Sequence, residues 1–276
     1  MGVVGRGTVH GAARDVGITQ TGVTQRIRAL ERALGVTLFT RSRLGMRLTA
    51  EGEALNRYCQ RVRDMEGELL ASLRGRAEEE SVRLVITGPS TAMRSRVIPQ
   101  TARVLEGFPN VAITFDLDDD ESGLGSLKRG AAQLAVLDRA EVPAELDSKI
   151  LAPMRYVLVG AKAWRRRSVR DVVARERIVD FNGDDDATLQ YLKRHRLLAA
   201  ARKDRHFANN IDALAAFVAA GHGYSVLAEE FAAPLIAAGV VVPLDPGRAD
   251  RVELALAWYP RPEMPAYFAA VVKEIK

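Results

Sequence analysis

The most constraining feature of this sequence is a pair of helical segments near its beginning, separated by one tight turn. Residues 9–16 and 20–34 have the apolar spacing of helices. Each segment has a threonine before it and a glycine after it: Thr8 and Gly17 for the first, Thr19 and Gly35 for the second. Threonine is a favoured N-cap residue, and glycine is favoured just past a helix end. We therefore expect a short helix, a sharp turn and a longer helix.

The longer helix is amphipathic. Its apolar residues recur three or four positions apart and predict one buried stripe: Val23, Ile27, Leu30 and Leu34. Its other face is polar and basic: Gln20, Thr21, Thr24, Gln25 and Arg28. Glutamine and arginine make bidentate hydrogen bonds to base edges, and threonine contacts a base or a methyl group. Two such helices joined by a tight turn are typical of a DNA-binding helix-turn-helix.

The segment after Gly35 predicts a small β-hairpin with a basic tip, a wing suited to phosphate contacts, which carries Arg41, Arg43 and Arg47. The first 47 residues hold eight arginines against two acidic residues, in a chain whose net charge is +5. This imbalance suits a polyanion such as DNA. The alternative is a charged face that only contacts water.

The stretch from Ala12 to Arg41 resembles the winged helix of LysR-type transcriptional regulators, as does the segment 48–52 that enters the next helix. By position, the resemblance implies that four residues reach base edges: Gln20, Thr21, Thr24 and Gln25. It implies that four arginines contact phosphate or the minor groove: Arg28, Arg41, Arg43 and Arg47. The family has a full helix before the position of Thr8, whereas seven residues precede it here. We expect a truncated first helix, with Val3 and Val4 in its last turn.

A long helix is expected after Thr49, which is its predicted N-cap. Apolar residues recur along it close to a heptad pattern: Leu55, Tyr58, Val62, Met65, Leu69 and Leu73. Such a seam pairs with a second helix, so we predict a homodimer. The alternative is that this helix packs on its own domain. Gly75 and the charged segment 76–80 are expected to form a hinge, and Cys59 beside the seam is interpreted as a half-buried filler.

From Ser81 onward, strand patterns alternate with helical patterns, which predicts a largely parallel α/β sheet. The predicted fold class is therefore α/β multidomain: an N-terminal winged helix-turn-helix, a long linker helix and a two-lobed α/β effector domain that resembles periplasmic binding proteins. The expected boundaries are 1–49 for the winged helix-turn-helix, 50–80 for the linker and hinge, 81–154 with 260–276 for effector lobe 1, and 155–259 for effector lobe 2.

Open α/β sheets bind ligands beyond the carboxyl ends of their strands. The polar residues expected at that edge, between the lobes, are Ser90, Thr91, Asp118, Asp119, Asp138, Asn182, Asn209 and His222. Ser90 and Thr91 stand where a helix begins, so free N–H groups and hydroxyls can bind a carboxylate there. The alternative for Ser90 is a simple N-cap. The acidic residues can neutralise an ammonium or guanidinium group, so together these features suit a basic amino acid.

Three further segments resemble the lysine- and arginine-sensing ArgP (LysG) subgroup of that family: 178–187, 209–214 and 256–260. This resemblance implies lysine or arginine as the small-molecule effector. The partners that we expect are double-stranded promoter DNA, further copies of the chain in a homodimer and then a homotetramer, and RNA polymerase as a candidate.

The sequence also argues against several classes of protein. The four histidines are isolated, and the motifs of metalloproteases, serine hydrolases and P-loop enzymes are absent, so we expect neither an enzyme nor a metal site or cofactor. No apolar run approaches the roughly 18 residues of a membrane span. The single cysteine fits a reducing cytoplasm. The alternative function is an amino-acid-binding protein whose short N-terminus impairs DNA binding.

Overall fold

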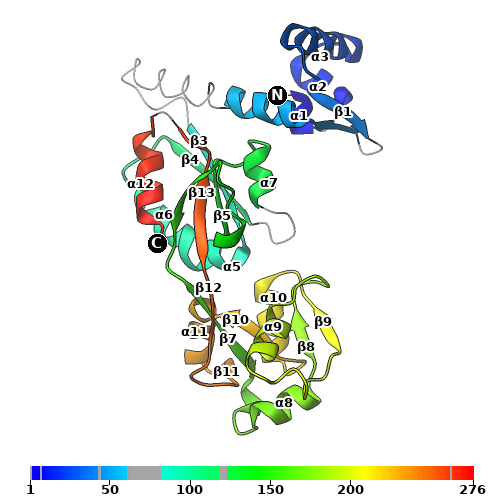
Figure 1. Ribbon diagram of the computed structural model, residues 1–276. Helices are drawn as coiled ribbons and strands as arrows, with labels where there is room; N and C mark the ends of the chain where they lie inside the picture. Colours follow the sequence, from blue (N-terminus) through cyan, green and yellow to red (C-terminus); the bar gives the residue numbers. More distant parts are fainter. Residues whose placement is uncertain are drawn as a thin grey trace.

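The computed structural model shows three parts in sequence: a small N-terminal head, a linker helix and two stacked α/β lobes (Figure 1). It describes residues 2–6, 8–42, 45–60, 62, 82–117, 123–261 and 263–276.

The head consists of short helices followed by a hairpin: α1 (Gly2–Arg6), α2 (Val9–Val16), α3 (Gln20–Leu34), β1 (Phe39–Ser42) and β2 (Gly45–Leu48). The hydroxyls of Thr8 and Thr19 accept hydrogen bonds from first-turn N–H groups at 3.1 and 3.0 Å. Gly17 and Gly35 end α2 and α3 with φ of 68°, a conformation that favours glycine. The predicted caps and helix limits of the helix-turn-helix are confirmed.

The core of the head is small and lies between α1, α2 and the first half of α3; its buried residues include Val3, Ala12, Ala13 and Val23. Ile27 is half-buried, but Leu30 and Leu34 are 44% and 48% exposed. The predicted buried stripe is therefore wrong in the second half of α3. The physical reason is the shortness of α1 and α2, whose apolar residues cover only the first half of the longer helix.

The linker helix comprises residues 50–60 and 62 among the described residues. Thr49 caps it, since its hydroxyl accepts a hydrogen bond from the N–H of Gly52 at 3.0 Å. Within the predicted seam, Leu55 is half-buried, while Tyr58 and Val62 are 58% and 44% exposed. Three other seam positions lie outside the described residues: Met65, Leu69 and Leu73.

Lobe 1 is built on a sheet of strand order β4-β3-β5-β13-β6, in which β3 pairs in parallel with β4 and β5. A continuous helical run, Ser90 to Leu105, follows β3 and contains one π-helical stretch. The final helix packs on α6 in lobe 1, the lobe to which the sequence expects residues 260–276 to return. The elements are β3 (Val82–Gly88), α5 (Ser90–Ala92), η1 (Met93–Val97), α6 (Ile98–Leu105), β4 (Val111–Leu117), α7 (Gly123–Lys128), β5 (Leu134–Asp138), η2 (Arg139–Glu141), β6 (Asp147–Ile150), β13 (Leu254–Trp258) and α12 (Ala266–Glu274).

Lobe 2 is organised around one long strand, β7, which pairs antiparallel with β10, β11 and β12. Beside it, β8 and β9 form a parallel pair. The elements are β7 (Met154–Ala161), η3 (Lys162–Trp164), α8 (Val169–Arg175), β8 (Ile178–Asp180), α9 (Ala187–Arg194), β9 (Arg205–Phe207), α10 (Ile211–Ala219), β10 (Ser225–Ala228), α11 (Glu229–Ala237), β11 (Val241–Pro243) and β12 (Asp250–Val252).

Two sequence expectations differ from these sheets. The expected end of lobe 2 at residue 259 is too late, because β13 pairs with β5 and β6 of lobe 1. Strands β12 and β13 form one extended run that changes sheets at Glu253, so hydrophobic patterning alone did not locate the crossing. The expected parallel pairing is found in lobe 1 only among β4, β3 and β5, because β13 pairs antiparallel with both β5 and β6; the strands that pair with β7 are all antiparallel to it. That strand enters lobe 2 from lobe 1, and its neighbours run back against it.

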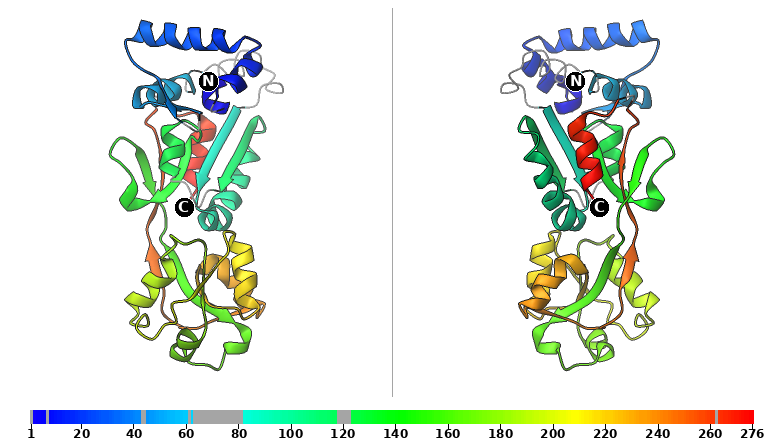
Figure 2. Two further views of the ribbon diagram at one scale, coloured as in Figure 1. Left: turned by 90° about the vertical axis from the view of Figure 1, so that its right-hand side faces the viewer. Right: turned by 90° about the vertical axis from the view of Figure 1, so that its left-hand side faces the viewer.

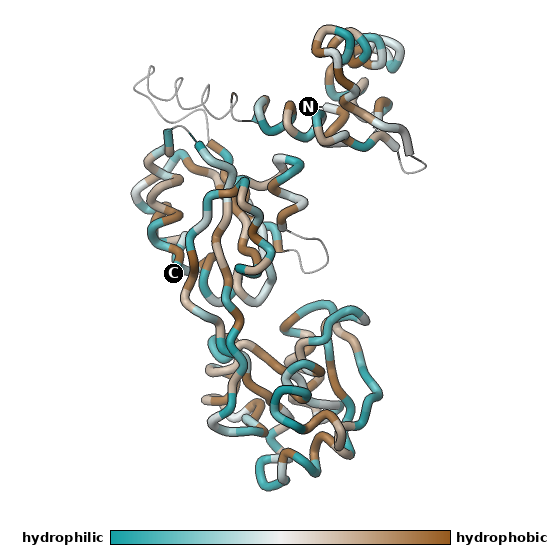
Figure 3. Tube along the Cα trace, viewed as in Figure 1, coloured by the Kyte–Doolittle hydropathy of each residue, from teal (hydrophilic) through white to brown (hydrophobic). Residues whose placement is uncertain are grey.

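The apolar core is continuous across the two lobes: one buried cluster includes Ile86 and Leu134 in lobe 1 and Leu227 and Val241 in lobe 2. Hydrophobic colour accordingly concentrates along the strands in Figure 3. None of the helices within the described residues has the length and hydrophobicity needed to cross a membrane.

Candidate functional site

The polar face of α3 is the candidate DNA-reading surface. Gln20, Thr21, Gln25 and Arg28 are exposed, and Thr24 is half-buried with its hydroxyl donating to the carbonyl of Gln20 at 3.0 Å. The views in Figure 2 place α3 at the end of the molecule farthest from lobe 2. An exposed helix face that carries glutamine, threonine and arginine fits the major groove of DNA.

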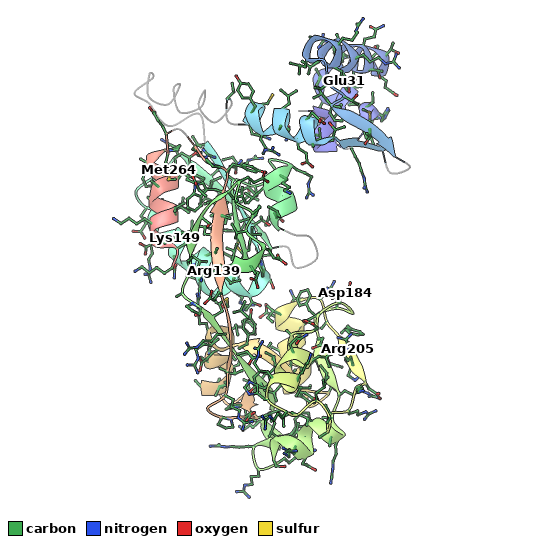
Figure 4. All side chains as sticks on the ribbon, viewed as in Figure 1. Glu31, Arg139, Lys149, Asp184, Arg205 and Met264 are labelled. Carbon is green, nitrogen blue, oxygen red and sulfur yellow. The ribbon has the colours of Figure 1, made fainter. Side chains whose placement is uncertain are left out.

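The wing is held against this helix by an acidic side chain. Glu31, labelled in Figure 4, accepts hydrogen bonds at its Oε1 from the N–H groups of Leu38 (2.8 Å) and Phe39 (3.3 Å). One of the few acidic groups of the head is thus directed at its own backbone and not at a ligand. Arg47 on β2 is exposed, and Arg41 lies on β1; Arg43 lies outside the described residues.

The boundary between the lobes is the second candidate site, and on the lobe 1 side it begins with Ser90. Ser90 and Thr91, both half-buried, open the helical run that follows the carboxyl end of β3. The first N–H groups of such a run lack intrahelical partners and attract anions. Asp138 is exposed at the carboxyl end of β5, where its carboxylate accepts the N–H of Ala140 at 2.8 Å.

Two arginines from the π-helical stretch of this run contact lobe 2. Arg94 pairs with Asp212 in the first turn of α10. Arg96 is 7% exposed and donates from its Nε to both carboxylate oxygens of Glu230 on α11, at 2.9 and 2.8 Å. π-helical stretches inside helices are frequent at functional sites. Here the stretch supplies two ion pairs between the lobes.

On the lobe 2 side, the loop after β8 is tied down by its own polar groups. Asn182 Oδ1 accepts the N–H groups of Asp184 and Asp185, both at 2.9 Å. Asp185 accepts the N–H groups of Phe181 and Ala187 at 2.9 and 3.0 Å. The acidic cluster seen in the sequence is therefore partly a structural turn.

The guanidinium of Arg205 also holds this loop through hydrogen bonds. Its Nη1 donates to Asp180 Oδ2 at 2.9 Å and to the carbonyl of Asp185 at 2.7 Å, and its Nη2 donates to the carbonyl of Gly183 at 2.7 Å. Burial raises the pKa of the Asp180 carboxyl above its ordinary value, whereas hydrogen bonds from Thr188 and Arg205 oppose that shift. The carboxylate of Asp184 takes no part in these contacts: it is exposed and has no hydrogen bond or ion pair among the described residues.

Asp184 was missed as a site residue by sequence reasoning, which chose Asn182 from the same loop. Figure 4 shows Asp184 at the end of lobe 2 nearer to lobe 1, and Arg139, which follows Asp138, at the end of lobe 1 nearer to lobe 2. The sequence signal was present as three consecutive aspartates, but it did not tell which of them caps the turn.

The remaining predicted effector residues lie at the two ends of α10 or outside the described residues. Asn209 is exposed just before α10, whose N-cap is its neighbour Asn210. His222 stacks on Phe217 with ring centroids 4.6 Å apart, in the last turns of α10, whereas Asp212 at the other end of that helix meets lobe 1. His222 therefore lies near the carboxyl end of α10, opposite the end that carries Asp212. Asp118 and Asp119 lie outside the described residues.

The chain matches two family models. Residues 2–53 match the bacterial regulatory helix-turn-helix protein of the lysR family, and residues 77–276 match the LysR substrate binding domain. LysG of Mycobacterium tuberculosis is 27% identical over 87% of this chain and 79% of its own length. ArgP of Aeromonas salmonicida is 25% identical over 85% and 80%. These relatives are transcriptional regulators and not enzymes.

Solved structures agree in fold. Full-length LysG from Corynebacterium glutamicum with bound effector Arg has a TM-score of 0.75 at 22% identity and covers 99% of this chain and 93% of its own. ArgP from M. tuberculosis has a TM-score of 0.77 at 24% identity, with coverages of 97% and 90%. CbnR in complex with its target DNA has a TM-score of 0.58 at 19% identity, with coverages of 99% and 95%. The chain belongs to the LysR family of helix-turn-helix transcriptional regulators.

Proposed function

We propose that this regulator binds a basic amino acid, lysine or arginine, at the boundary between its effector lobes. The observation that carries this proposal is the placement of opposite chemistries at facing edges. A helix start at Ser90 offers N–H groups to a carboxylate, and the exposed carboxylates of Asp138 and Asp184 suit a cation. The arginine bound to LysG of C. glutamicum supports the same ligand class.

Matched ligand pairs test this proposal by calorimetry. L-Arginine is compared with L-citrulline, which lacks the positive charge, and with agmatine, which lacks the carboxylate. L-Lysine is compared with L-norleucine. We expect Asp184→Asn to weaken arginine binding but not citrulline binding, and Ser90→Ala to weaken arginine binding but not agmatine binding. Equal binding of arginine and citrulline by the unmodified protein refutes a cation site.

For DNA, we propose that Gln20, Thr21, Thr24 and Gln25 contact base edges and that the basic residues contact the backbone: Arg28, Arg41, Arg43 and Arg47. The exposure of the α3 face supports this assignment. The rival function, an amino-acid-binding protein without DNA binding, is tested by titrating salt against duplex DNA. Phosphate contacts give a steep negative slope of log affinity against log salt, and a flat slope refutes the assignment.

We further propose that the exposed Tyr58 and Val62 form a dimer seam with the rest of the predicted heptad positions, and that dimers assemble into a tetramer. RNA polymerase is a candidate partner, and the cytoplasm is the compartment in which such a regulator meets DNA. Sedimentation of Tyr58→Glu tests the seam, because a charge placed in a packed helix pair disfavours association. A variant as dimeric as the unmodified protein refutes it.

A further inference from the structure

The linker helix contacts lobe 1 at the carboxyl end of α7. Asn56 donates from its Nδ2 to the carbonyl of Arg129 at 2.5 Å, and Arg57 donates from its Nη1 to the carbonyl of Lys128 at 2.8 Å. Carbonyls at a helix end have no intrahelical donor. The Arg57 guanidinium also lies 4.6 Å from the centroid of the Tyr259 ring. Side chains of the linker helix therefore cap a helix of the effector lobe.

The other end of α7 lies against the sheet edge that carries the proposed effector residues. A Cβ built on Gly123 would lie 3.1 Å from Leu137 and 3.5 Å from Thr87, which are near the carboxyl ends of β5 and β3. Ser90 follows β3, and Asp138 is the last residue of β5. A helix of six residues is about 9 Å long. One short rigid element thus joins the effector edge to the linker helix, as the position of α7 in Figure 1 illustrates.

In the contact between the linker helix and α7, one buried polar atom has no hydrogen-bond partner among the described residues. Asn56 is 5% exposed, and its Oδ1 is buried without a hydrogen-bond donor among the described residues. A buried carbonyl without a donor costs free energy that is recovered when water reaches it. Undocking of the linker helix loses two hydrogen bonds and the contact of Arg57 with Tyr259, but it hydrates this oxygen, which lowers the net free-energy cost of undocking. An equilibrium between the docked and undocked arrangements is shifted by a difference in ligand affinity between them.

We propose that docking of Asn56 and Arg57 on the carboxyl end of α7 transmits effector binding from the lobe boundary to the DNA-binding head. This proposal rests on the proposed function, since it requires an effector at that boundary. A ligand that displaces the start of α7 displaces its carboxyl end as well, which changes the docking of the linker helix and the orientation of the head. Because coupling is reciprocal, bound DNA changes effector affinity by the same factor.

The thiol of Cys59 can report whether the linker helix is docked on α7. Cys59 is the single cysteine of the chain, is half-buried and lies two residues after Arg57. Its rate of reaction with a thiol reagent is measured with and without L-arginine. Arg57→Ala removes a capping donor. Gly130→Ala perturbs the contact from the lobe side, since Gly130 has φ of 68° and its Cβ would lie 3.2 Å from Asn56 Nδ2. Arg103→Ala is the matched control, an exposed arginine on α6.

In the unmodified protein and the control, we expect saturating L-arginine to change the labelling rate by at least about 5-fold, the lower end of typical allosteric coupling. In Arg57→Ala and Gly130→Ala, the change falls below about 2-fold, while calorimetric affinity for L-arginine changes by no more than the coupling factor of about 5-fold and circular dichroism stays native. Variants that keep the full ligand-dependent change overturn the proposal.

A wrong effector assignment can be distinguished from a wrong docking assignment. If neither L-arginine nor L-lysine binds in calorimetry, the effector assignment is wrong, and the docking contact is judged from ligand-free rates. Faster labelling in both variants than in the control then supports the docking of the linker helix on α7. Equal rates overturn it.

Discussion

Replacing Arg96 with methionine should selectively loosen the joint between the effector lobes. Methionine keeps much of the volume of the side chain, so the change removes mainly its polar contacts. These contacts are the carboxylate of Glu230 on lobe 2 and the main-chain carbonyls of Ala152 and Pro153 in the crossing segment. One buried guanidinium thus holds three different segments together.

The expected cost follows from the exposure of each partner. The Glu230 side chain is 43% exposed, so its pairing with Arg96 contributes about 1 kcal/mol after solvent screening. Hydrogen bonds from a charged group to the two carbonyls contribute about 1.5 kcal/mol each, the low end of their range because the chain around them is exposed. We expect a loss of about 3–4 kcal/mol in the free energy of unfolding.

Arg94→Met is the matched control, because Arg94 lies on the same π-helical stretch and also joins the lobes. Its side chain and that of its partner Asp212 are 48% and 56% exposed, so the loss should be about 0–1 kcal/mol. Urea unfolding is followed by tryptophan fluorescence, since both tryptophans, Trp164 and Trp258, lie in the lobes. Equal losses in the two variants would refute the reasoning.

Three other predictions follow from single groups. Gln25→Ala should lower discrimination between specific and random duplex DNA by about 1–3 kcal/mol, whereas Arg28→Ala should weaken both equally and reduce the salt slope by about one; fluorescence anisotropy distinguishes them. Lys149→Met should lower the free energy of unfolding by about 1.5–3 kcal/mol, because Lys149 donates three hydrogen bonds of 2.8 Å to carbonyls at the carboxyl end of α12. A urea midpoint unchanged from that of the unmodified protein contradicts this prediction. Burial raises the pKa of Asp180, so the folded state binds a proton more tightly than the unfolded state: its relative stabilisation is fully present below pH 3.8 and is lost as pH rises through the raised pKa. Melting temperatures against pH should therefore show a smaller gain on acidification in Asp180→Asn, and parallel curves contradict the assignment.

Local rules located the head of this protein well. Thr8, Gly17, Thr19 and Gly35 cap the helices as predicted, because capping depends on residues within one turn of each other. The second half of α3 was not predictable in the same way. Leu30 has the spacing of a core residue, yet its burial depends on which other elements are long enough to reach it.

The effector site was only partly predictable for the same reason. Ser90 and Asp138 fall at strand ends, a position that local pattern reveals. The hydrogen bonds of Asn182 in its turn and the stacking of His222 on Phe217 depend on contacts that spacing along the sequence does not reveal. The interlobe pairs of Arg94 and Arg96 join residues more than a hundred positions apart, which no spacing rule detects.

On the effector assignment proposed above, the acidic loop of lobe 2 favours a zwitterion whose long side chain ends in a positive charge. Asn182 and Asp185 are occupied in the turn, and Asp186 accepts a hydrogen bond from Gln190 at 2.8 Å, so Asp184 carries the free charge of the loop among the described residues. A ligand carboxylate held at Ser90 in lobe 1 leaves only the far end of the ligand to reach lobe 2. The side chains of lysine and arginine end in a cation, whereas citrulline has a similar length without the charge. A ligand stabilises an arrangement of the lobes only through contacts that differ between arrangements. The positive end of the side chain, rather than the common amino-acid core, is therefore the part that should change the output of the regulator.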